Sequence, residues 1–389
     1  MRNQFSSPMG FTAALGGAAR LACYAFASAA VLLAAPGAAR AQSAIVVGQS
    51  CDLSGATSAR VKEYVKGVDA YLAKVNSQGG VAGRPIKLIR YDDAFNGDKG
   101  LENARRLVEQ DGAMVLFGMG SAATTAAVLP YASEKRVPVF GSMSGATSLR
   151  KPQPMLIHLR ASFADEVNRL ASHFAVTGIK RIGVLAADLP IGKDGIAAIE
   201  AAAKVHGLTI VEIARVSGDL KDLDQAVAAL AKSQPAAVLI LAPAGPGIKF
   251  TEAIKKAGIT AQLAGLSVMS SDSLYKALGD KVQGMVITQV VPFPWNPRTE
   301  LGRDYQKLMT ETSTPVSVDS VEGYVAARLL VEALKASAPK LTRESFIAGV
   351  EAMTRKDVDG MAVSFSAADR SLTRMVDITM LAKGGKLVN

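Results

Sequence analysis

Two turns of small residues contain the side chains and backbone groups best suited to bind a ligand. The first, Gly118-Met119-Gly120-Ser121, follows an apolar run at 113–117, and Ser121 stands where a helix should begin. The start of a helix combines unpaired N–H groups with the positive end of the helix dipole, and both favour anions. The second turn, residues 141–147, follows the next predicted strand. Because neighbouring parallel strands end at one crevice, we predict that both turns line a site for a small solute.

The first turn also matches the dinucleotide pattern G-x-G-x-x-A at residues 118–123. That fingerprint requires an acid about 20 residues later, at the end of the next strand, to hold the ribose hydroxyls. Residues 139–142 are Val-Phe-Gly-Ser, with no carboxylate. The sequence therefore predicts no nucleotide cofactor.

Patterns for catalysis or metal binding are weak. The three histidines, His158, His173 and His206, occur without an H-E-x-x-H motif, and neither paired cysteines nor a G-x-S-x-G elbow is present. The pair Asp92-Asp93 could suggest a metal, but we interpret it as a strand-end pair that orients a neighbouring loop. We predict no enzyme, no cofactor and no metal site.

The N-terminal segment is typical of export. An apolar run at residues 21–35 is shorter than a membrane-spanning helix, and Ala39-Arg40-Ala41 supplies an A-x-A cleavage site. We predict a signal peptide at 1–41, cleaved after Ala41, with an uncleaved anchor as the alternative. After cleavage only Cys51 remains, which rules out an internal disulfide. We interpret Cys51 as a small buried residue, with a pocket-lining thiol as the alternative.

The charge pattern argues against a nucleic-acid partner. Cleavage would remove three arginines and no acid, which leaves 41 basic against 34 acidic residues and a net charge of +7. The basic residues are spread along predicted helices and are not interleaved with aromatic residues. Solubility accounts for this charge better than a polyanionic partner does.

The turns must be positioned by an alternation of strands and helices that runs through the chain and restarts near Ser162. Such alternation predicts an α/β fold with two doubly wound lobes. We place lobe 1 at 42–161 plus 292–361, and lobe 2 at 162–291 plus 362–389. In this arrangement the chain crosses between the lobes near Ala161, Val291 and Met361, which gives a hinge of several strands.

A series of short signatures resembles the leucine/isoleucine/valine-type periplasmic binding proteins. They are Cys51–Gly55, Val75–Arg84, Tyr91–Ala94, Pro138–Gly141 with Ser144–Ala146, and Leu159–Ser162. The likeness runs in order over nearly all of residues 44–389. It implies a type I periplasmic binding fold and a protein that delivers its solute to an ABC permease.

The resemblance also implies roles for residues of the site. Ser121 matches a hydroxyl ligand for the solute carboxylate, and Met143 and Gly145 match contacts of the second turn. Amino-acid binders have a hydroxyl where Gly145 stands, a role that Ser142 or Ser144 could take over. Asp165 matches an acid that pairs with the solute ammonium, and it can equally be the N-terminal acid of a helix.

In lobe 2 the chain departs from the amino-acid binders. Ile191 stands where a tyrosine is common, and Ala244-Gly245 also lacks the tyrosine of that position. Both changes argue against leucine as the solute. The predicted ligand-binding set is Ser121, Thr124, Ser142, Met143, Ser144, Gly145, Phe163, Asp165, Ile191, Ala244 and Met269.

Together these observations predict a periplasmic protein that binds an amino acid, an amide or an aromatic acid. An ABC permease is the partner that the resemblance implies, and a monomer is the state typical of the family. The alternative is an exported sensory protein that reports ligand occupancy to a receptor, and an enzyme is the third candidate. The sequence does not identify the solute.

Overall fold

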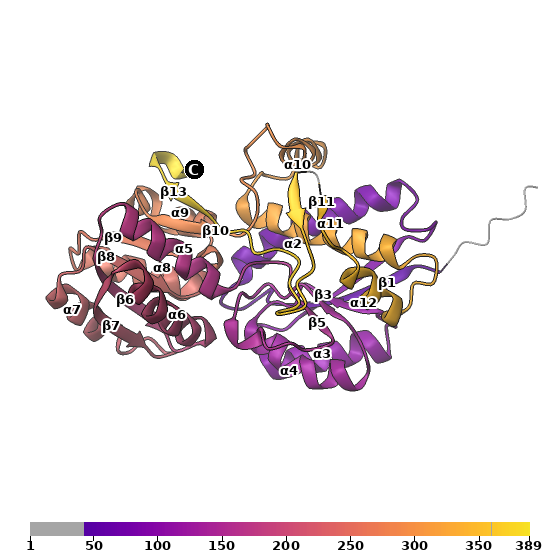
Figure 1. Ribbon diagram of the computed structural model, residues 1–389, viewed down its shortest axis with the longest axis horizontal. Coiled ribbons are helices and arrows are strands. Elements are labelled where there is room, and N and C mark those ends of the chain that lie inside the picture. The colour runs from indigo at the N-terminus through magenta and orange to yellow at the C-terminus, as the bar shows by residue number, and fades with distance from the viewer. Residues whose placement is uncertain (1–42, 359) are drawn as a thin grey trace, which may run out of the picture. The chain divides into compact units, whose positions relative to one another are not determined.

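Two β-sheets form the frame of residues 44–389 in the computed structural model, which describes residues 43–358 and 360–389 (Figure 1). The predicted signal peptide and its cleavage point lie outside the described residues. The first sheet has the order β2-β1-β3-β4-β5, and all its strands are parallel. Its strands are β1 (Ile45–Cys51), β2 (Ile86–Asp92), β3 (Val115–Phe117), β4 (Val139–Phe140) and β5 (Leu156–Ile157).

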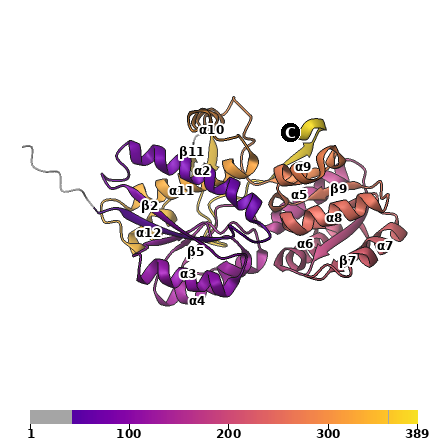
Figure 2. The same ribbon diagram turned by 180° about the vertical axis from the view of Figure 1, so that it is seen from behind.

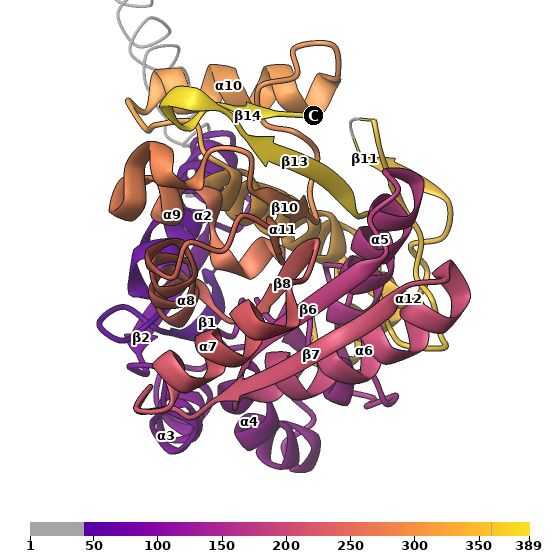
Figure 3. The ribbon, with the colours of Figure 1, turned by 90° about the vertical axis from the view of Figure 1, so that its left-hand side faces the viewer.

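The second sheet has the order β14-β13-β10-β9-β8-β6-β7, most of which can be followed in Figure 3. Strands β6 to β10 are parallel to one another, whereas β13 runs antiparallel to β10 and β14 antiparallel to β13. The strands are β6 (Arg181–Ala187), β7 (Thr209–Val216), β8 (Ala237–Leu241), β9 (Gln262–Gly265), β10 (Val286–Gln289), β13 (Asp377–Leu381) and β14 (Leu387–Val388).

Helices cover both faces of each sheet. In the first sheet, Phe117 and Phe140 belong to the core that includes α2 and α11, whereas Leu116 and Val139 belong to the core that includes α3 and α4. Figures 1 and 2 show these two pairs of helices on opposite sides of the sheet. The first lobe contains α2 (Ser58–Ser77), α3 (Gly97–Glu109), α4 (Ala122–Glu134), α10 (Glu300–Glu311), α11 (Val318–Ser337) and α12 (Arg343–Glu351).

The second lobe repeats this design. Its helices are α5 (Phe163–Val176), α6 (Pro190–His206), α7 (Leu223–Ser233), α8 (Ala244–Lys256) and α9 (Ser271–Leu278). Successive residues of β6 and β8 again enter two different cores: Val184 and Leu239 pack with α5 and α6, and Leu185 and Ile240 with α8 and α9. Strands that are buried on both faces are typical of doubly wound sheets, so the predicted fold class is confirmed.

The last passage of the chain between the lobes differs from the prediction. Residue 161 follows β5 and precedes α5, and residue 291 follows β10, so both lie where the chain changes sheet. The sequence places the third passage near Met361, at strand β12 (Met361–Val363), which pairs with β11 (Lys356–Val358). The amide of Ser364, however, donates to the carbonyl oxygen of Leu372. The amide of Leu372 in turn donates to the carbonyl oxygen of His158, which follows β5 in the first lobe. The third passage therefore follows Leu372, about ten residues later.

Helices α2 and α11 cross at a pair of glycines. A Cβ on Gly67 would lie 1.8 Å from the carbonyl oxygen of Ser320, and a Cβ on Gly323 would lie 1.9 Å from that of Tyr64. Both positions therefore exclude any side chain. This close approach matters for the site because α2 carries Arg60 and α11 carries its acidic partners.

We expect Gly67→Ala to lower the free energy of unfolding by about 3 kcal/mol or more, because the added methyl group forces the two helix backbones apart. Urea unfolding followed by circular dichroism measures the change. Gly218→Ala is the matched control: its Cβ would meet no atom within 4 Å, and we expect a change of at most about 0.5 kcal/mol. Equal stability of the two variants would contradict the tight crossing.

Candidate functional site

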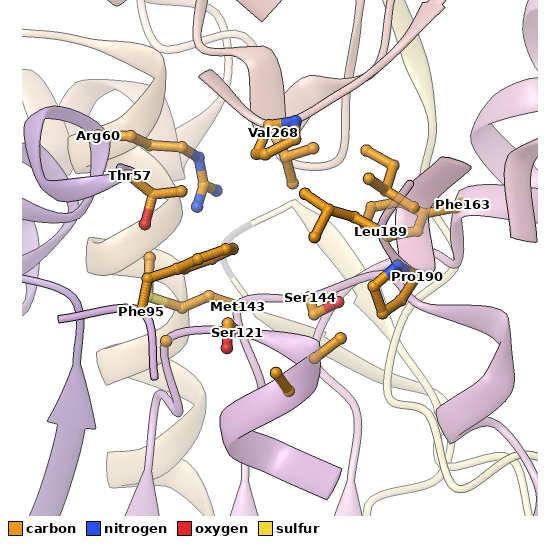
Figure 4. Close-up of a pocket in the computed structure, with 15 residues that line it drawn as sticks. Thr57, Arg60, Phe95, Ser121, Met143, Ser144, Phe163, Leu189, Pro190 and Val268 are labelled. Atoms are coloured by element: carbon orange, nitrogen blue, oxygen red, sulfur yellow. The ribbon is translucent and has the colours of Figure 1, made fainter. Parts of the chain in front are cut away.

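A pocket lies between the two lobes at the carboxyl ends of the parallel strands (Figure 4). It contains about 610 Å³ of space free of protein atoms, part of which is open to solvent. The first lobe contributes Thr57, Arg60, Phe95, Gly120, Ser121, Ala122, Ala123, Met143 and Ser144. The second lobe contributes Phe163, Leu189, Pro190, Ile191, Pro243 and Val268.

The first predicted turn leads directly into the pocket. Gly118 has a φ of 59°, and a Cβ on Gly120 would lie 2.8 Å from the Cα of Cys51, so the turn requires glycine at both positions. Ser121 is the N-cap of α4, and its Oγ accepts a hydrogen bond of 3.0 Å from the amide of Thr124. The predicted cap is confirmed.

The start of α4 offers unpaired donors to the pocket. The amides of Ala122 and Ala123, which line the pocket, have no acceptor within the described part of the chain. Thr124 lies behind them, where its hydroxyl donates to Asp93 at 3.3 Å. Cys51 is buried beneath the turn and does not line the pocket, and its burial raises the pKa of the thiol to about 12. The interpretation of Cys51 as a small buried residue is confirmed.

The second predicted turn contributes Met143 and Ser144. The hydroxyl of Ser144 accepts from the amide of Ala146 at 3.1 Å. The Ser142 hydroxyl lies 2.8 Å from that of Thr125 and accepts from the amide of Ser144, so it supports the turn and does not line the pocket.

Gly145 marks a place where the aromatic ring of Phe163 covers the backbone. A Cβ on Gly145 would lie 2.8 Å from the ring, and the amide of Phe163 donates to the carbonyl of Gly145 at 2.6 Å. Gly145 itself does not line the pocket, whereas Phe163 does. A glycine at this position therefore allows the ring to reach the pocket wall.

The carboxylate of Asp165 forms hydrogen bonds at the start of its own helix, α5. It accepts from the amide and the hydroxyl of Ser162, at 2.9 and 2.6 Å, in a capping box. Its other oxygen lies 3.1 Å from Arg374. The structure thus has Asp165 as a helix N-terminal acid, and it does not line the pocket.

The second lobe contributes apolar side chains at the starts of two helices. Leu189 is the N-cap of α6, Pro190 and Ile191 begin that helix, and Pro243 is the N-cap of α8. Ala244 and Met269 are buried and stand outside the lining. Met269 fills the space above Gly247 and Gly265, and a Cβ on Gly245 would lie 2.7 Å from the carbonyl oxygen of Ala56 in the first lobe.

Of the described residues that line the pocket, ten are absent from the predicted ligand-binding set, and three of these, Thr57, Arg60 and Phe95, lie in the first lobe away from both predicted turns. The amide and the hydroxyl of Thr57 both donate to Asp52 at 2.7 Å. Phe95 has a φ of 62°, and its amide donates to Asp93 at 3.0 Å. The Asp92-Asp93 pair therefore orients a loop, as predicted, but nothing in the sequence marks Phe95 as the residue that this loop presents.

Arg60 belongs to a buried cluster of charges. Its Nη2 bonds Glu322, and its Nε lies 3.1 Å from Asp319. Glu322 also accepts from Arg160 at 2.9 Å, and Arg160 lies 3.1 Å from Glu166 on α5. The cluster therefore joins α2 and α11 of the first lobe to α5 of the second.

Two acids have raised pKa values: Asp319, which is buried in this cluster, and Asp272, which is partly buried beside it. Burial raises the pKa of Asp319 to about 7, although the nearby Arg60 acts in the opposite direction. Burial also raises the pKa of Asp272 on α9 to about 6, with the amide of Val318 opposing and Glu63 reinforcing the shift. Both carboxyls hold their proton at a pH at which they would be ionised in the unfolded chain.

Within residues 43–358 and 360–389, no helix combines the length and hydrophobicity needed to cross a membrane. The same residues contain no group of three His, Cys, Asp or Glu side chains placed to hold a metal ion.

Comparison with known proteins gives a consistent picture. A family model described as periplasmic binding protein matches residues 44–386. The Leu/Ile/Val-binding protein homolog 6 of Brucella melitensis biotype 1 is 23% identical over 348 residues, which cover 87% of this chain and 88% of that protein.

Solved structures show the same fold. A substrate-binding periplasmic protein from Ralstonia solanacearum is 27% identical, has a TM-score of 0.82, and is matched over 88% of this chain and 99% of that one. A branched chain amino acid ABC transporter protein from Thermus thermophilus, solved with bound valine, is 20% identical with a TM-score of 0.79, over 89% of this chain and 95% of that one. The second likeness is one of fold alone.

We expect Asp272→Asn to reduce the dependence of stability on pH. A carboxyl with a raised pKa stabilises the folded state most at low pH, and this contribution is lost as pH rises from about 4 through about 6. The change in the free energy of unfolding between pH 4.5 and pH 7.5 should therefore be about 2 kcal/mol less negative in the variant than in the wild type.

Urea titrations at several pH values measure this difference. Asp224→Asn, a change at an exposed position on α7, is the control and should keep the wild-type slope. If Asp272→Asn has the wild-type slope as well, the raised pKa is contradicted.

Proposed function

Because the chain belongs to the periplasmic binding protein family, we propose that it captures a small organic solute between its lobes and delivers it to an ABC permease. The observation that carries this proposal is the pocket, which is lined from both lobes by the first residues of α4 and α6 and by the N-cap residue of α8. We propose further that the chain is exported, cleaved after Ala41, and acts as a monomer.

The pocket supports binding without chemical conversion of the solute. Of the described residues that line it, none is a histidine, cysteine, aspartate or glutamate, so the hydroxyls of Ser121 and Ser144 have no general base beside them. Hydroxyl and amide donors at one end and apolar side chains around them are typical of a site that holds and orients a small molecule.

Solute binding would favour a closed arrangement of the lobes. A solute in this pocket touches Ser121 and Ser144 from the first lobe, and Leu189 and Ile191 from the second. Only contacts that are gained on closure can shift the equilibrium between open and closed forms. The permease would then recognise the rims of the two closed lobes.

The direct test is to purify the protein from the periplasm and to identify the solute released on denaturation by mass spectrometry. We expect one small organic compound in stoichiometric amount, which rebinds to the emptied protein in calorimetry. If no compound is released and no heat is measured with any amino acid, amide or organic acid, the proposal is overturned.

We expect Ser121→Ala to weaken binding of that solute about tenfold, because a hydroxyl partner in a buried site is lost. Calorimetry measures the dissociation constant. Thr299→Ala is the matched control, because it also removes a helix N-cap, that of α10, and Thr299 does not line the pocket. Both variants should lose about 1 kcal/mol of stability, but only Ser121→Ala should lose affinity. Equal affinities of the two variants would contradict the role of Ser121.

A further inference from the structure

Three helices begin at the pocket, and the first turn of α4 offers it free backbone donors, whereas Pro190 and Pro243 have no N–H and the amide of Leu189 donates to Ala187. Helix α4 presents the free amides of Ala122 and Ala123, and the N-caps of α6 and α8, Leu189 and Pro243, line the same space. Neither of these two N-cap residues bonds its helix through its side chain. At the start of a helix the N–H groups point outward, whereas the carbonyls point along the helix into its own hydrogen bonds. The free amides at the start of α4 therefore favour an anion at that end of the pocket.

The one charged side chain in the described lining is also a cation. Arg60 is only 4% exposed, yet its guanidinium is directed into the pocket (Figure 4). Its Nε and Nη2 are paired with Asp319 and Glu322, which stand outside the lining, whereas its Nη1 has no hydrogen-bond partner among the described residues. This buried guanidinium is a second observation, independent of the helix starts, that points to an anionic group on the solute.

Among the described residues, no carboxylate lines the pocket to pair with a cationic group. Two acids that bond lining residues are already committed: Asp52 accepts from Gly55 and Thr57, and Asp93 accepts from Ser50, Thr124 and Phe95.

The same is true of Asp165, for which the resemblance implies a pairing with a solute ammonium. Asp165 is held by Ser162 and Arg374. A buried ammonium without a partner is strongly disfavoured. The site can therefore satisfy a carboxylate but offers no side-chain counterion to an amine.

The remainder of the wall is apolar. Phe95, Met143, Phe163, Leu189, Ile191 and Val268 surround the space in front of the donors. These side chains match an aliphatic or aromatic body, because they offer it no hydrogen bond and remove its surface from water.

We propose that the solute is a small organic carboxylate with an apolar body and no amino group. This inference rests on the proposed function, because it names the class of solute that the pocket selects. The carboxylate lies among Ser121, the first turn of α4 and Arg60, and the apolar body lies against the second lobe.

The test compares acids that differ only in the amino group. Calorimetry on the emptied protein would use leucine against 4-methylpentanoate, and phenylalanine against 3-phenylpropanoate. We expect at least one deaminated acid to bind, and to bind at least tenfold more tightly than its amino acid. The neutral 3-phenylpropanamide should bind at least tenfold more weakly than 3-phenylpropanoate, because it lacks the negative charge.

Other outcomes separate this inference from the proposed function. An amino acid that binds as tightly as its deaminated partner, or more tightly, overturns the inference and leaves the function intact. A released solute that contains an amine also overturns the inference and leaves the function intact. The same conclusion follows if none of these acids binds but a different released solute rebinds to the protein. If the protein releases no solute and binds none, both proposals fail.

A matched pair of variants tests the absence of a counterion directly. Ile191→Asp places a carboxylate in the lining at the first turn of α6, where a helix tolerates an acid, and Ile191→Asn has the same shape without the charge. The preference for 3-phenylpropanoate over phenylalanine should fall at least tenfold in Ile191→Asp relative to Ile191→Asn. The same preference in both variants would overturn the inference, and melting curves of the two would verify that both are folded.

Discussion

The arrangement of the site depends on one buried arginine. Arg160 lies just after β5, where the chain first leaves the first sheet, and its guanidinium bonds Glu322, Glu166, the hydroxyl of Ser267 and the carbonyl oxygen of Met143. It therefore holds together α11, the second turn of the pocket and two elements of the second lobe. A charge buried to this degree must keep its partners, because removal of one leaves the others unpaired in a medium of low polarity.

This requirement restricts how the two lobes can move. The second oxygen of Glu166 accepts from the amide of Ser267 at 2.8 Å and from the hydroxyl of Thr288 at 2.5 Å, so the acid is fixed within the second lobe. Separation of Glu166 from Arg160 would break this ion pair while both charges remain buried. Motions that keep this pair together, with rotation about the three passages of the chain, are less costly than motions that break it. The same network fixes Arg60 through Glu322, which both arginines share.

The parts of the site that could be predicted from sequence are those whose cause is local. Gly118, Gly120 and Ser121 form a strand–turn–helix junction whose geometry depends only on residues a few positions apart. Arg60 could not be found in this way, because its partner Glu322 is 262 residues distant and no short pattern connects them. Asp165 remained ambiguous because an N-terminal acid and a ligand acid have the same local sequence, and only contacts such as that with Arg374 distinguish them. The fold class followed from the strand–helix alternation, whereas the third passage did not, because it depends on pairing near His158.

The positions at which this chain departs from the amino-acid binders share one property: each lacks a polar side chain. Where the resemblance implies a hydroxyl, Gly145 leaves room for the ring of Phe163. Where a tyrosine is common, Ile191 presents an apolar side chain, and at Gly245 the backbone lies so close to Ala56 that a side chain would not fit. Each of these three positions lacks the polar side chain that the resemblance implies for amino-acid binders, while Ser121 and the free amides of α4 are present in the first lobe. A pocket altered in this way keeps one polar end and gains an apolar one, so selectivity must come from the fit of the apolar body and from the cost of burying any further polar group.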